Sequence, residues 1–288
     1  ALFTIACVIG VQYTEFAFTS SDVTEGLSFW NGIPVAYLGV AIAAFGITGV
    51  GGDEVMAYNY WLLEKGYAAK TGPRDDSPEW NRRARGWIKV MYWDAFLSML
   101  VYTYITVAFY ILGAAILNAQ GLVPEGFETV KTLSRMYTDS LGPWAETAFL
   151  IGAFFVLFST LFSALAAWSR LFSDAFGAVG WIDYQDEKSR GRAIAGFAFF
   201  FPALWALLFF YFEDPVFMVL AGGAITAAIL ILVVIASIHF RYRRLPKSLA
   251  PSKGYDFGFW LSASAIALLA VIAVWQAVKK FLDSIPGT

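Results

Sequence analysis

Two adjacent carboxylates in an apolar stretch have the clearest chemical potential in this sequence. Asp53 and Glu54 directly follow residues 46–52, which contain four glycines, and mostly apolar residues 55–63 come next. On insertion scales, a charged side chain at the centre of a membrane helix costs roughly 2.5–3.5 kcal/mol, and each glycine costs a helix about 1 kcal/mol relative to alanine. Such a combination favours an unwound segment that offers oxygen ligands to a cation. The alternative is a solvated cap near the helix end.

Asp94 is a third carboxylate within an apolar window, about seven residues inside the window 87–118. It either carries a proton or forms an ion pair with a nearby Lys or Arg. Elsewhere the sequence has no zinc-ligand spacing, no phosphate-binding loop and no nucleophile with a matching base, so an enzyme is not predicted.

These residues have to be positioned by elements that lie in lipid. Apolar residues make up 59% of the 288 residues, charged residues only 15%, and the mean hydropathy is +0.62. A soluble domain of this size could not bury so much apolar surface. The long continuous apolar runs exclude a β-barrel and predict an all-α integral membrane fold, with the lipid bilayer as its main partner. The net charge of −2 gives no reason to expect nucleic acid as a partner.

Glycine, proline and charge clusters divide the chain into six windows long enough to cross a bilayer, preceded by a shorter apolar segment. The expected spans are a partial one at 1–13, a broken one at 33–63, and further spans at 87–118, 144–169, 193–212, 215–240 and 257–278. We expect a single transmembrane domain in which 33–63 forms two half-helices, unwound somewhere within 46–56. A short surface helix is expected at 127–137. Because the chain opens with Ala1 inside an apolar run, we also expect that a span has been cut; a naturally short chain is the alternative.

The distribution of basic residues predicts the orientation. Alternate connecting segments (64–89, 170–192 and 241–256) contain sixteen Lys and Arg residues, whereas the intervening segments and the C-terminus contain four. By the positive-inside rule the richer segments face the cytoplasm, which places the C-terminus outside.

Residues 46–68 read GITGVGGDEVMAYNYWLLEKGYA. This run resembles the broken central helix of NRAMP-related divalent metal transporters, and in particular a bacterial branch in which the helix continues into Tyr-x-Tyr-Trp-x-x-Glu-Lys-Gly-Tyr-Ala. The rest of the chain is similar to the family more in layout than in motif. The resemblance implies the bacterial inner membrane and an eleven-span protein whose first ten spans form two inverted repeats. This chain would then hold the end of span five to span eleven, that is, the second repeat of a LeuT-like fold plus one further span.

The resemblance also implies a site. Family members have Met-Pro-His at the break, and a residue three positions before the Met offers its carbonyl. Met56 takes the Met position, Asp53 the carbonyl position and Tyr58 the His position. The predicted metal ligands are therefore Asp53 and Met56, with Glu54 as the alternative carboxylate. The residues expected to line the cavity or couple transport are Gly49, Gly52, Tyr58, Asn59 and Asp94.

Several departures leave the metal open. Loss of the His puts the usual coupling in doubt, a nearby carboxylate favours magnesium or manganese, and a thioether favours manganese, iron or cobalt. The Asp-Pro-Gly-Asn motif of the first repeat, which supplies half of the family's site, is absent from these residues. We expect that repeat to be a partner, in the same protein or as a separate chain.

The leading expectation is secondary transport of a divalent cation (Mn, Fe or Mg), with protons as the candidate coupling ion and no tightly bound cofactor. A structural membrane subunit that has lost transport is the alternative.

Overall fold

The computed structural model describes residues 2–26 and 38–283. Within these ranges the chain forms helices and turns and contains no strand, so the predicted all-α fold is confirmed. The chain divides into two compact units. The first contains Ala1–Gly32 and Leu100–Val219, and the second contains Ile33–Met99 and Leu220–Thr288.

The core of the first unit forms around α7 (Thr129–Leu141), which packs against α1 (Leu2–Gly10) and α8 (Trp144–Ala178). The short 3-10 turns η1 (Val11–Tyr13) and η5 (Gly126–Glu128) and the small helix α2 (Ser20–Gly26) complete this region. Tyr137 is 3% exposed, and its hydroxyl lies 3.2 Å from that of Thr4. The helix expected at 127–137 is therefore present with shifted ends. Its buried face, however, makes it part of the core.

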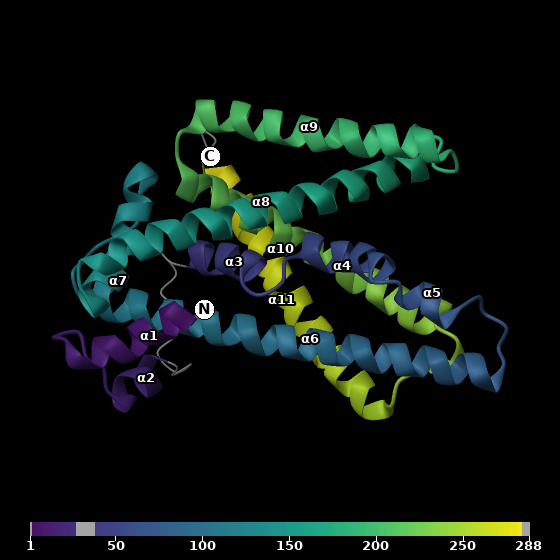
Figure 1. Cartoon of the computed structure of the whole chain (residues 1–288), viewed down its shortest axis with the longest axis horizontal. Coiled ribbons are helices and arrows are strands. Elements are labelled where there is room, and N and C mark those ends of the chain that lie inside the picture. Colours follow the sequence, from purple (N-terminus) through teal and green to yellow (C-terminus); the bar gives the residue numbers. More distant parts are fainter. Residues whose placement is uncertain (1, 27–37, 284–288) are drawn as a thin grey trace. The chain divides into compact units, whose positions relative to one another are not determined.

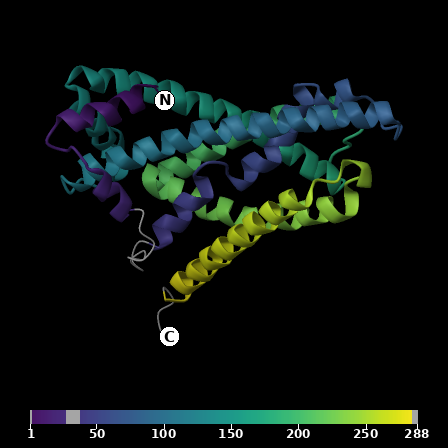
Figure 2. The same cartoon turned by 90° about the horizontal axis from the view of Figure 1, so that it is seen from below.

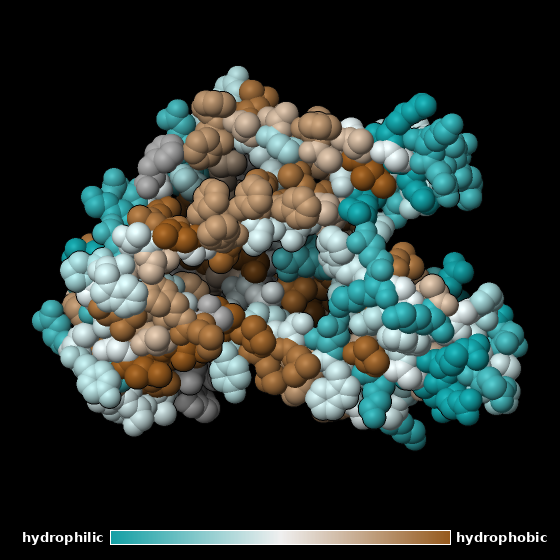
Figure 3. Space-filling view, viewed as in Figure 1, coloured by the Kyte–Doolittle hydropathy of each residue, from teal (hydrophilic) through white to brown (hydrophobic). Residues whose placement is uncertain are grey.

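An antiparallel pair, α8 and α9 (Glu187–Phe212), also belongs to the first unit (Figure 1). Six aromatic rings interdigitate between the two helices, with ring centroids 5.0–6.4 Å apart: Trp168, Phe172 and Phe176 from α8, and Phe197, Phe201 and Trp205 from α9. The Asp186 carboxylate caps α9 by accepting the backbone N–H groups of Lys188 and Ser189. Figure 3 shows apolar side chains over the middle of this pair and hydrophilic ones at its connecting loop, as a membrane span requires.

The second unit carries the predicted broken span. It contains α3 (Leu38–Ile47), α4 (Gly52–Glu64), α5 (Tyr67–Thr71) and the first part of α6 (Pro78–Leu112), which continues as the π-helical turn η4 (Gly113–Asn118) in the first unit. Most of α10 (Pro215–His239) also belongs here. A π-helical turn, η6 (Phe240–Arg244), and a 3-10 turn, η7 (Lys247–Leu249), then lead into α11 (Lys253–Asp283), as Figure 2 shows.

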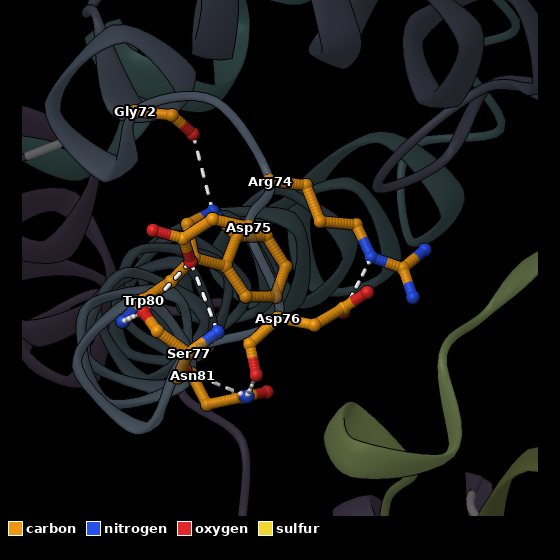
Figure 4. A network of polar contacts seen from close by, with 7 residues as sticks. All are labelled: Gly72, Arg74, Asp75, Asp76, Ser77, Trp80 and Asn81. Atoms are coloured by element: carbon orange, nitrogen blue, oxygen red, sulfur yellow. Dashed lines mark hydrogen bonds and ion pairs between the residues drawn. The ribbon is translucent and has the colours of Figure 1, made fainter.

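A polar turn fixes the start of α6 (Figure 4). The Ser77 hydroxyl accepts the Trp80 backbone N–H at 3.0 Å and donates to Asp75 at 2.7 Å, while the indole N–H of Trp80 donates to the Gly72 carbonyl at 3.1 Å. The hydrogen bonds from Ser77 hold the pKa of the Asp75 carboxyl below its ordinary value. Because Pro78 occupies the first helical position and lacks an N–H to satisfy, α6 begins here.

Five helices in the described residues are long and apolar enough to cross a membrane, which makes this an integral membrane protein. They differ from the expected spans mainly at their polar ends: α6 begins at Pro78 rather than near residue 87, and α8 ends at Ala178 rather than near 169. A helix continues past the apolar window until a cap or glycine ends it, which an estimate from hydropathy alone misses.

Candidate functional site at the broken helix

The helix break lies between α3 and α4. Helix α3 ends at Ile47 and α4 begins at Gly52, so residues 48–51 are not helical. Gly49 has φ +86°, in the left-handed region that favours glycine. The predicted interval for unwinding, 46–56, contains this segment. The beginning of the expected span, residues 33–37, lies outside the described residues.

The glycines around the break pack directly against α10, within the second unit. A Cβ atom at Gly46 would overlap the carbonyl oxygen of Gly223, and one at Gly223 would overlap that of Ala43. Beyond the break, a Cβ atom at Gly52 would lie 2.9 Å from Cγ2 of Ile229 and 3.1 Å from the Leu230 backbone nitrogen. The glycine cluster therefore allows close backbone contact on both sides of the break, in addition to the unwinding itself.

Glu54 caps the second half-helix. Its carboxylate accepts the Gly51 backbone N–H at 2.8 Å, one half of a capping box that glycine cannot complete. Sequence reasoning considered a cap only near the helix end and did not assign this role to Glu54, although its position three residues after Gly51, the last residue before α4, is the signal. Asp53 is half-buried in the same first turn, and its Oδ1 would lie 2.9 Å from a Cβ atom at Gly51. The helix dipole stabilises both carboxylates at this position.

Asp53 and Met56 lie one turn apart on α4, so they share a face of the helix. That face is the more buried one: Ala57 is 4% exposed, and Asp53, Met56 and Tyr60 are half-buried. Asn59 is exposed and donates through its side-chain amide to the Met56 carbonyl at 3.2 Å. The structure thus places Asp53 and Met56 together in the first turns of α4, directly after Gly52, with Asn59 directed back at the helix backbone. Gly49 lies in the non-helical segment that precedes this helix.

Asp94 is the centre of a polar network that joins α4 to α6. Its Oδ2 accepts the Tyr58 hydroxyl at 2.9 Å and the Lys65 ammonium at 3.0 Å. Of the two possibilities left open by the sequence, the structure contains the ion pair. The hydrogen bond to Asp94 raises the pKa of Lys65 above its ordinary value, so the ammonium remains charged. Tyr58 lies five residues beyond Asp53, a rise of about 7.5 Å along the helix, and therefore belongs to this network rather than to the break.

We expect the Lys65–Asp94 pair to contribute little to stability, because the two side chains are 47% and 32% exposed. A double-mutant cycle with Lys65→Met and Asp94→Asn, measured by thermal unfolding in detergent, should give a coupling energy of about 0.2–1 kcal/mol. A coupling energy well above this range would show that the pair is shielded from solvent in the assembled protein.

The ligand chemistry at the break is limited to a few groups. Within residues 2–26 and 38–283, no three His, Cys, Asp or Glu side chains gather into a metal-binding cluster. Two carboxylates, one thioether and the carbonyl groups of an unwound segment are what the break itself offers. Oxygen donors of this kind suit hard divalent cations, and a single sulfur extends the range to softer ones.

Within the described residues, this helical membrane protein has an interrupted helix followed by two carboxylates, a feature from which membrane transporters build ion sites. Comparison with known families agrees: the model of the Nramp family, described as natural resistance-associated macrophage protein-like, matches residues 13–276. The chain belongs to the Nramp family, and this membership supports divalent metal-ion transport. No curated protein matched the chain, and no solved structure matched it either.

Proposed function

We propose that this chain forms one wall of a secondary transporter for divalent cations of the Mn, Fe and Mg class, in which Asp53 and Met56 bind the transported ion. The observation that carries the proposal is the interruption at residues 48–51, which places a half-buried carboxylate and a thioether on one face of α4 directly beyond unwound backbone. Family membership supports the general activity, and the choice of metal rests on these donors.

The donor set favours a metal between hard and soft. Asp53 and the carbonyl groups of residues 48–51 suit Mg²⁺ and Mn²⁺, whereas the Met56 sulfur favours Mn²⁺ and Fe²⁺ over Mg²⁺. Mn²⁺ accepts both kinds of ligand, so it is the ion that we propose to be transported best. Glu54 adds a negative charge to the same region, and its carboxylate accepts the Gly51 N–H.

Proton coupling is proposed to act through Asp94. Protonation of Asp94 would remove the charge that attracts the Lys65 ammonium and would weaken the connection between α4 and α6. The proposed orientation, with the C-terminus outside, follows from the distribution of basic residues, and the resemblance to the family suggests a bacterial inner membrane.

The test is uptake of Mn²⁺ into proteoliposomes, using the protein together with the first repeat of the family, in one chain or as a separate chain. We expect Mn²⁺ uptake above that of protein-free vesicles, and stimulation by an inward proton gradient. If neither a pH gradient nor a membrane potential drives uptake of any divalent cation, the proposal that this protein is a transporter is wrong. A structural membrane subunit then takes its place.

A further inference from the structure

Two basic segments far apart in the sequence meet at one end of the second unit. The Arg85 guanidinium on α6 donates to the backbone carbonyl of Ser248, at 2.6 Å, in the segment between α10 and α11. This contact brings the first two turns of α6 beside the segment 240–250. The basic surface, as we call it, consists of Arg82, Arg85, Lys89, Arg243, Arg244 and Lys247, all of which are exposed.

The charge of this surface is largely uncompensated. Asp256 is the acidic residue of the adjoining segment, and Arg241 already neutralises it through two hydrogen bonds of 2.7 and 2.8 Å. In the part of the chain that the structure describes, no carboxylate forms an ion pair with Arg243, Arg244 or Lys247. On α6 the nearest acidic residue in sequence is Glu79, one turn before Arg82.

The framework beneath the basic surface is fixed by specific contacts. Besides the Arg241–Asp256 pair, the indole N–H of Trp260 donates to the Tyr242 hydroxyl at 2.8 Å, and the rings of Tyr92 and Tyr255 lie 5.8 Å apart. These contacts connect the segment after α10, the start of α11 and the fourth turn of α6 to one another. The exposed guanidinium groups are therefore presented from a defined surface rather than from a free loop.

We propose that the basic surface binds the phosphate headgroups of anionic phospholipids in the adjacent leaflet. It lies at the polar ends of three helices that are long and apolar enough to cross a membrane, α6, α10 and α11. Trp87 and Trp260, on two of these helices, are aromatic residues of the kind that anchor at headgroup level. Clusters of Lys and Arg directly beside a span attract anionic lipid, and guanidinium groups bind phosphate oxygens through paired N–H groups. The positive-inside rule depends only on the number of basic residues in a connecting segment. The Arg85–Ser248 hydrogen bond in addition brings basic residues from two segments together into one surface.

The experiment titrates phosphatidylglycerol into the detergent-solubilised protein and follows the midpoint of thermal unfolding, with phosphatidylcholine as the reference lipid. Binding to the folded state raises this midpoint. We expect phosphatidylglycerol to stabilise the wild-type protein more than phosphatidylcholine does. In the variant Arg243→Gln with Arg244→Gln, the apparent affinity for phosphatidylglycerol should fall about tenfold. High salt should weaken the wild-type effect, because exposed charges are screened.

Two variants make the result specific. Lys188→Gln with Arg192→Gln removes two positive charges from the start of α9, in the other unit, and should leave the phosphatidylglycerol response unchanged. Arg243→Lys with Arg244→Lys preserves the charge and should restore most of it. Equal losses in the Arg243/Arg244 and Lys188/Arg192 glutamine variants would overturn the proposal in favour of non-specific attraction. Competition by soluble glycerol phosphate at the concentration of the lipid would also overturn it, in favour of a site for free phosphate.

Discussion

Replacing Gly223 with alanine should destabilise the second unit strongly, although the change adds a single methyl group. The new Cβ atom would overlap the Ala43 carbonyl oxygen, and it would lie 3.1 Å from the Ala43 carbonyl carbon. Backbone atoms at a helix contact cannot rotate away as a flexible side chain can, so α3 and α10 would have to separate. Overpacking of a well-packed core costs about 1–3 kcal/mol, and we expect the upper part of this range. Thermal unfolding in detergent measures the loss.

Gly222 supplies a matched control on the same helix. A Cβ atom at Gly222 meets nothing within 4 Å, so Gly222→Ala should leave the unfolding midpoint unchanged or raise it, because alanine favours a helix over glycine. Gly46→Ala should resemble Gly223→Ala, since its Cβ atom would overlap the Gly223 carbonyl oxygen. Equal midpoints for the Gly222 and Gly223 variants would mean that α3 and α10 do not approach each other this closely.

The sequence was sufficient to predict where the helix breaks. Four glycines followed by two carboxylates conflict with a continuous apolar helix, and both effects are local enough to be read from neighbouring residues. The break between Ile47 and Gly52 falls within the predicted interval. The ion pair of Asp94 was also one of two stated possibilities, because a carboxylate inside an apolar window needs either a proton or a cationic partner.

The partners across the fold could not be predicted in the same way. Nothing in residues 46–52 indicates that Gly46 meets Gly223 rather than another small residue, because the choice depends on how two helices cross. Lys65 was likewise one of several cations that could reach Asp94. The buried position of α7 was missed because its apolar spacing looks the same whether the helix faces lipid headgroups or α1 and α8.

The same glycines explain how a break can be stable beside α10. Unwinding residues 48–51 removes helical hydrogen bonds, and close packing of Gly46 and Gly52 against α10 offsets part of that loss. Glu54 satisfies the Gly51 N–H that would otherwise lack a helical partner. Glu54 therefore stabilises the start of α4, and Asp53 is the carboxylate that shares the more buried face of this helix with Met56.

Separate neutralisation of the two carboxylates should give unequal effects on transport. We expect Asp53→Asn to reduce Mn²⁺ uptake by about a hundredfold, since one charge-assisted ligand is lost from a site with few donors; loss of a hydrogen bond to a charged group is worth about 1.5–3 kcal/mol. Glu54→Gln keeps an oxygen that can accept the Gly51 N–H at the same position, so it should retain most of the uptake. Initial rates in proteoliposomes at several Mn²⁺ concentrations separate weaker binding from slower turnover.

The control for this comparison is stability, because Asp53 and Glu54 both favour the first turn of α4 through the helix dipole. Asp53→Asn and Glu54→Gln each remove one charge from that turn, so their unfolding midpoints should fall by similar small amounts. A large loss of uptake in Asp53→Asn alone would then reflect ligand chemistry rather than folding. If Asp53→Ala with Glu54→Ala leaves Mn²⁺ flux unchanged, the ion is bound elsewhere. The two carboxylates would then serve only to begin the second half-helix.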